Sequence, residues 1–128
     1  MSLFHLLVVA VGGAAGSVCR YAVTLAAARV LGPGFPWGTL VVNVVGSAAM
    51  GLLVGVLAAR SDGGSQAVRL LIATGFLGGF TTLSSFSLDA VMLYERGEGG
   101  AALIYVAASI LLSLGGLVAG LALVRTLA

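Results

Sequence analysis

The chain has 128 residues, of which 60% are hydrophobic and 8% charged, and its formal net charge is +2. Soluble domains carry about 25% charged residues, so this composition excludes an ordinary soluble domain and argues against nucleic-acid binding. The sequence instead predicts one integral membrane domain that covers residues 1–128.

Four segments are apolar over about the 20 residues that a membrane-spanning helix needs. The first is interrupted by Arg20, and the other three contain no charge. In chain order they are Leu3–Ala28, Trp37–Ala59, Leu70–Leu88 and Gly99–Val124. We therefore expect an all-α membrane protein with four transmembrane helices, short connections and both termini on the same side.

The first segment is expected to be a retained helix rather than a signal peptide. Its start, Met-Ser-Leu-Phe-His, lacks the basic residues that precede the apolar stretch of a signal peptide. The turn cluster 32–36, Gly-Pro-Gly-Phe-Pro, follows this helix. Trp37 then fits the interfacial depth at which tryptophan is enriched, so the second helix should begin there.

Small residues recur at four-residue spacing in every predicted span, a pattern that lets helix backbones approach closely in lipid. The pairs are Gly12 with Gly16, Gly51 with Gly55, Gly75 with Gly79, and Gly116 with Gly120. The adjacent pair Gly78-Gly79 precedes two threonines, and we expect the third helix to be broken near it. Irregular backbone at membrane depth survives only where protein or a water-filled cavity covers it. This stretch therefore predicts a pathway for something polar.

Uncharged polar residues concentrate in the last three spans. Asn43 lies among valines in the second span and needs hydrogen-bonding partners there. The fourth span carries three hydroxyls at four-residue spacing, which places them on one helical face. The hydroxyl residues are Thr81, Thr82, Ser84, Ser85 and Ser87 in the third span, and Tyr105, Ser109 and Ser113 in the fourth. The stripe predicts a polar track; the alternative is hydrogen bonding between helices.

The sign of the ion stays open from hydroxyls alone, because they offer oxygen to a cation or hydrogen to an anion. Arg20 favours an anion by placing positive charge near one end of the path. Phe80 and Phe86 border the hydroxyls, where a ring edge can face an anion, although composition alone favours packing for both rings. Asp89 is the only acid in or near a span.

The arginines do not choose an orientation in the membrane. Three lie on the face that carries the termini, and two, with Arg20 as a third that can snorkel, belong to the opposite face. These are Arg60, Arg69 and Arg125 against Arg29 and Arg96. Either the charge rule is weak here, or copies insert both ways and pair as an antiparallel dimer.

Several functions are disfavoured by what the chain lacks. His5 is the only histidine, so no nucleophile and base pair is expected, and the chain should not be an enzyme. A small proton-coupled transporter of the multidrug type is the main alternative, but it needs a carboxylate deep in the membrane, usually in the first helix, and that helix has none. A non-conducting packing subunit would explain the glycines but not Asn43 with the hydroxyl stripe.

Three segments together resemble the Fluc (CrcB) family of small fluoride channels. They read Gly-Gly-Ala-Ala-Gly-Ser-Val-Cys-Arg-Tyr over 12–21, Pro-Trp-Gly-Thr-Leu-Val-Val-Asn-Val-Val-Gly-Ser over 36–47, and Thr-Gly-Phe-Leu-Gly-Gly-Phe-Thr-Thr-Leu-Ser-Ser-Phe-Ser over 74–87. Their order, their spacing and the four-span layout all match.

The resemblance implies an antiparallel homodimer of dual topology that exports fluoride passively. It would span the plasma membrane of a bacterium or archaeon, surrounded by lipid, with two pores along the subunit interface and a structural sodium ion at the dimer centre. By motif position, the backbone carbonyls of Gly78 and Thr81 would hold the sodium ion.

The resemblance also assigns the fluoride pathway. Asn43 would donate to fluoride, Phe86 would present a ring edge, and Arg20 would supply positive potential at the vestibule. The polar track would be Tyr105, Ser109 and Ser113, and the residues from Thr82 through Ser84 and Ser85 would border the path.

Two positions depart from the family pattern. Leu83 replaces the first of two pore phenylalanines, and leucine has no electropositive ring edge. Asp89 stands where related sequences often carry glutamate, so it is a candidate for gating or for a simple hydrogen-bonding partner.

Overall fold

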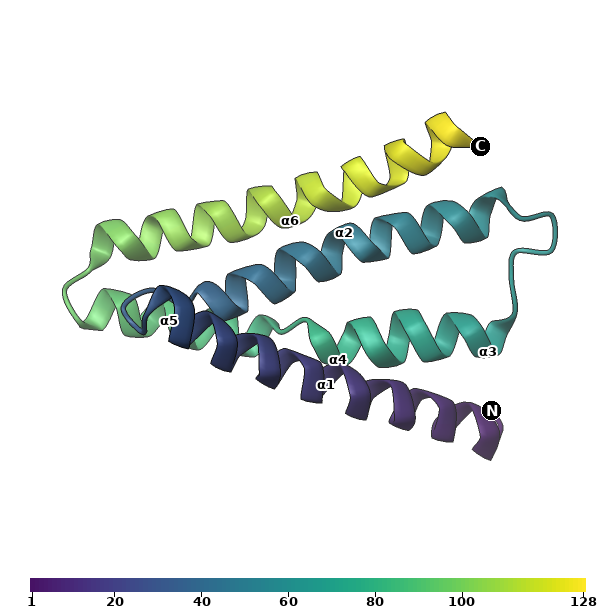
Figure 1. Cartoon of the computed structure of the whole chain (residues 1–128), viewed down its shortest axis with the longest axis horizontal. Coiled ribbons are helices and arrows are strands. Elements are labelled where there is room, and N and C mark those ends of the chain that lie inside the picture. Colours follow the sequence, from purple (N-terminus) through teal and green to yellow (C-terminus); the bar gives the residue numbers. More distant parts are fainter.

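The computed structural model describes all 128 residues as an all-helical chain without strands. Four spans run alternately up and down, and both termini lie at the same end (Figure 1). The first is α1 (Leu3–Leu31), the second α2 (Trp37–Ala59) and the last α6 (Gly99–Leu127). The third, Gln66–Glu95, consists of several pieces. The predicted four-span layout, the common side of the termini and the start of the second helix at Trp37 are confirmed.

The third span changes its helical geometry along its length. It begins as α3 (Gln66–Arg69), continues as the π-helical η1 (Leu70–Leu77) and the single turn α4 (Gly78–Phe80), and resumes after a break as α5 (Leu83–Glu95). The predicted break is confirmed, but its place is just beyond the glycine pair. Gly78 keeps helical dihedral angles, whereas Thr81 and Thr82 are extended.

Glycines at two helix seams allow backbone-to-backbone contact. Along α1 and the third span, added Cβ atoms on Gly12, Gly16 or Gly79 would meet backbone atoms of the facing helix. Along α2 and α6, the pair with the most extensive contact, Gly51 and Gly120 do the same. The predicted close packing through four-residue spacing is therefore confirmed at both seams.

The buried core is small and lies where α2, α5 and α6 meet. Leu40, Leu93, Ala102 and Tyr105 form it, with Phe86 packed against its edge. Most other large apolar side chains are exposed, which fits a chain whose surroundings are hydrocarbon rather than water. Because so little is buried within one chain, the glycine seams carry much of the helix packing.

We predict that Gly120→Ala destabilises the fold, because its Cβ would lie 2.6 Å from the Ala48 carbonyl oxygen and 2.8 Å from the Leu52 nitrogen. Overpacking of this kind costs about 1–3 kcal/mol. Thermal unfolding in detergent, followed through Trp37, measures it. The matched control is Gly115→Ala on the same helix, where nothing lies within 4 Å of the new Cβ. Equal melting temperatures for the two variants would contradict the close seam.

Candidate ion pathway

The break in the third span is held by the side-chain amide of Asn43 on α2. Asn43 Nδ2 donates to the Thr82 carbonyl at 3.0 Å, and the Thr82 N–H donates to Asn43 Oδ1 at 2.7 Å. One side chain thus satisfies both backbone groups of an extended residue at membrane depth, where unpaired groups are costly. Asn43 thus has the hydrogen-bonding partners that we expected from its place among valines. Its second Nδ2 proton remains free for another acceptor.

This arrangement redirects the backbone hydrogen bonds that would otherwise close the helix. In an unbroken α-helix the Thr82 N–H would donate to Gly78 and the Ser85 N–H to Thr81. Here the first goes to Asn43, and the second goes to Thr82 Oγ1 at 3.1 Å, which caps α5. The carbonyl oxygens of Gly78 and Thr81 are therefore both without their ordinary helical donors.

Arg20 also reaches the break, from α1. Its Nε donates to the Gly79 carbonyl at 3.0 Å, and the residue is half-buried. The guanidinium therefore gives the Gly79 carbonyl a charged hydrogen-bond donor and brings positive charge to the break. The structure places the predicted vestibule charge beside the middle of the third span rather than at an exposed end.

A groove of about 340 Å³ runs past the break between α2, the third span and α6. It brings together six of the nine predicted pathway residues with Ser47 and Thr81. The six are Asn43, Thr82, Leu83, Phe86, Ser109 and Ser113. The groove is lined without any charged side chain, so its polar groups are an amide and hydroxyls.

The other three predicted pathway residues lie outside this lining. Ser84 is exposed, with its Oγ 3.3 Å from Thr82 Oγ1, and Ser85 takes part through its backbone N–H. Tyr105 is fully buried beside the groove, with its ring centroid 5.3 Å from that of Phe86. Phe80 is buried as well and stacks on Phe76, so its packing explanation holds.

Ser109 carries the clearest chemical signal in the groove. Its side chain is buried, with 5% of the residue exposed, and its Oγ has no hydrogen-bond partner. It is the only such atom in the chain. Serine in a helix commonly bonds its own backbone or a neighbouring helix, so a buried hydroxyl left free beside a groove fits a site for a polar ligand.

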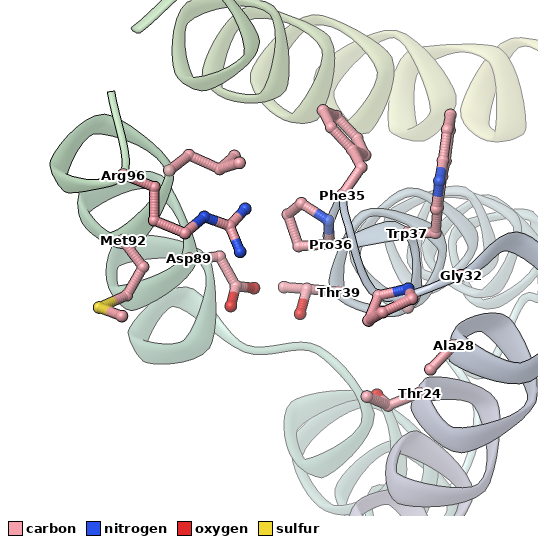
Figure 2. Close-up of a pocket in the computed structure, with 13 residues that line it drawn as sticks. Thr24, Ala28, Gly32, Phe35, Pro36, Trp37, Thr39, Asp89, Met92 and Arg96 are labelled. Atoms are coloured by element: carbon pink, nitrogen blue, oxygen red, sulfur yellow. The ribbon is translucent and has the colours of Figure 1, made fainter. Parts of the chain in front are cut away.

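A second cavity, the outer cavity, has a volume of about 260 Å³ and lies at the end of the molecule opposite the termini. Figure 2 shows the residues that line it. Asp89, Thr39 and Arg96 line it. Tyr105 donates its hydroxyl to Asp89 Oδ2 at 3.1 Å, and Arg96 donates to the Gly34 carbonyl at 3.1 Å. Asp89 is thus a hydrogen-bonded acid in the lining of this cavity, and Tyr105 joins it to the core beside the groove.

Sequence reasoning missed two contributors on α2. Thr39 lines the outer cavity and Ser47 lines the groove, one on each side of Asn43 at four-residue spacing. The spacing is the signal that could have found them, because it puts all three on one helical face. This stripe on α2 runs beside the stripe of Tyr105, Ser109 and Ser113 on α6.

Comparison with known proteins gives a consistent result. Residues 7–121 match the family described as CrcB-like protein, Camphor Resistance (CrcB). A relative from Rhizobium etli (strain CIAT 652), named fluoride-specific ion channel FluC, is 56% identical over 120 residues, covering 94% of this chain and 95% of the relative. FluC of Agrobacterium fabrum is 52% identical over 125 residues, covering 98% and 99%. FluC 1 of Nitrobacter hamburgensis is 51% identical over 127 residues, covering 99% and 100%.

We predict that Asn43→Asp lowers the stability of the folded chain. A carboxylate can still accept from the Thr82 N–H, but it cannot donate to the Thr82 carbonyl, which is left unpaired at a cost of about 1–3 kcal/mol. Thermal unfolding in detergent measures the change. Ser47→Ala, one turn along the same face, is the control because Ser47 holds no backbone group of the break. If Asn43→Asp melts like the parent, the amide does not fasten the break.

Proposed function

The chain belongs to the CrcB family, and we propose that it is a fluoride-selective channel that lets fluoride leave the cell passively. It is a multi-pass membrane protein whose relatives, at 51–56% identity over almost the whole chain, are named fluoride-specific ion channels. The observation that supports conduction by this chain is the Ser109 hydroxyl, which has no hydrogen-bond partner and lines the same groove as Asn43, whose amide has one Nδ2 proton left to donate. A channel of this kind is not an enzyme.

Fluoride is small and holds its hydration water strongly, so a pore must offer close donors at several successive sites without binding too tightly at any. The groove supplies such donors in sequence: the second Nδ2 proton of Asn43, then the hydroxyls of Ser109 and Ser113. The ring of Phe86 adds an electropositive edge. Because the lining carries no acid, nothing there repels an anion, and Arg20 adds positive potential nearby.

A second copy in the opposite orientation would complete the path. The groove is open along the surface of a single chain, and Leu83 on its rim is 76% exposed. Polar lining of this kind cannot face hydrocarbon, so protein must cover it. The near-balanced arginines support copies inserted both ways, and a pair of antiparallel copies would bring two grooves and hence two pores.

The centre of that dimer would hold a structural sodium ion. Gly78 and Thr81 would bind it through backbone carbonyls, which suit a hard cation. Both carbonyls lack their ordinary donors, because the Thr82 N–H donates to Asn43 and the Ser85 N–H donates to Thr82 Oγ1. Gly78 is also exposed on the single chain, which leaves room for a partner. The ion would supply fixed positive charge and tie the two copies together at the break.

The proton-coupled transporter is the weaker alternative. It requires an interior carboxylate that binds and releases protons during transport. Asp89, the only acid of the spans that does not stand at a span end, already accepts the Tyr105 hydroxyl at the outer cavity, away from the groove. Proton dependence of transport separates the two functions.

We predict that liposomes containing the protein release fluoride rapidly down its gradient and release chloride very slowly. An ion-selective electrode measures both anions. Trapped fluoride, or fluoride that moves only when a proton gradient drives it, would overturn the channel proposal.

In the same assay, Ser109→Ala should slow fluoride release about two- to tenfold, since it removes one donor worth about 0.5–1.5 kcal/mol. The matched control is Ser87→Ala, because the Ser87 hydroxyl is exposed and already donates to the Leu83 carbonyl at 2.9 Å. Equal rates for both variants would remove Ser109 from the pathway.

We further predict that the protein inserts in both orientations. A protease site placed after Ala128 should be cut in about half of the molecules when the outside of intact cells is treated, and in all of them after the membrane is permeabilised. The control is a single-orientation membrane protein with the same tag. Uniform protection or uniform cleavage in intact cells would contradict dual topology.

A further inference from the structure

A third cavity lies at the end of the molecule that carries the termini, remote from the proposed fluoride pathway. It occupies about 250 Å³ between the last turns of α2 and the first turns of the third span, beneath the loop that joins them. Leu53, Val54 and Leu57 form one wall, and Ala73 and Arg69 lie on the other side. The wall formed by α2 is therefore apolar, and Arg69 is the only charged residue that lines the cavity.

Arg69 differs from the other cation of this connection in having no counter-ion. Arg60 lies 3.5 Å from Asp62, and Asp62 also accepts the Gly64 N–H at 2.9 Å. Asp62 is the only acid of the connection, and it is engaged by these groups. Arg69 is exposed and has no ion pair or side-chain hydrogen bond. The unpaired Arg69 guanidinium thus lies at the edge of this apolar cavity, which we call the terminal groove.

The depth of these groups matches the structure of a lipid. Arg69 immediately precedes the uncharged stretch 70–88, so it lies at the level of the headgroups. The apolar wall continues from there toward the hydrocarbon. Phosphate carries its charge at the first depth and acyl chains lie at the second, and basic residues at grooves between spans recognise anionic headgroups in this way.

We propose that the terminal groove binds an anionic phospholipid, with Arg69 at the phosphate of the lipid and the apolar wall of α2 along an acyl chain. The shared chemistry with free phosphate is the guanidinium contact, but only a lipid also fills the apolar wall. The site is built by the residues of one chain, so it depends on neither the fluoride pathway nor the dimer.

Quenching of tryptophan fluorescence by brominated lipids tests the proposal. Trp37, the only tryptophan, is replaced by phenylalanine, and Val54→Trp then places a reporter in the groove at a side chain that is already 45% exposed. The protein is reconstituted with brominated phosphatidylglycerol or brominated phosphatidylcholine. One arginine near an anionic headgroup is worth about 1 kcal/mol, so we expect about a fivefold preference for phosphatidylglycerol.

Arg69→Gln in the same background should abolish that preference. Arg125→Gln is the matched control, since Arg125 lies on the same face of the membrane but does not line the groove. A second reporter, Leu123→Trp, is exposed on α6 and should show no preference. Inorganic phosphate added to the vesicles should not compete.

Three results would overturn the proposal. Equal quenching by the two lipids at Val54→Trp would exclude an anionic site. A preference that survives Arg69→Gln would exclude Arg69 as the headgroup ligand. Absence of quenching by either lipid would mean that protein, such as a second copy, covers the groove. The readout is fluorescence and not fluoride release, so its failure leaves the proposed function standing.

Discussion

The two hydrogen bonds between Asn43 and Thr82 are the interaction on which the rest of the structure depends. They pair an extended residue at membrane depth with a side chain instead of with its own helix. Without them the third span would have either to close into a continuous helix or to leave backbone groups unpaired in hydrocarbon. Because they exist, the break is stable, and the carbonyls on its N-terminal side are available to other partners such as the Arg20 guanidinium.

The glycine seams make this interaction geometrically possible. A side chain as short as asparagine reaches a neighbouring backbone only when the helices lie close together. Gly46 on α2 lies against the Thr81 side chain, less than one turn beyond Asn43. On the other side, Gly16 and Gly79 bring α1 close enough for Arg20 to reach the same break. Close packing and polar function are therefore two consequences of the same small residues.

Local sequence patterns predicted the features that depend on nearby residues, namely the spans and the start of the second helix. Apolar length gave four spans, and the interfacial Trp37 marked the start of α2. The position of the break was harder, because glycine is flexible in isolation but Gly79 is required here for contact with α1 while it remains helical. The helix is interrupted at Thr82, and the hydrogen-bonding partner of Thr82, Asn43, is 39 positions away in the sequence. No local pattern contains that pairing. The four-residue spacing of Thr39, Asn43 and Ser47 could have shown that α2 contributes more than one polar group.

The proposed dimer would have the same structure on both sides of the membrane, because its two copies would be antiparallel. In the proposed dimer, antiparallel copies related by a twofold axis in the membrane plane would present the same outer cavity, with its Asp89 and Arg96, to both sides. A path that is identical from either side has no built-in direction, so the gradient alone decides which way an anion moves. Selection for a single orientation would then confer nothing, and an arginine count that is nearly balanced between the faces carries no penalty. A passive channel of this kind would work in either orientation, so it would tolerate a charge pattern that does not orient the chain.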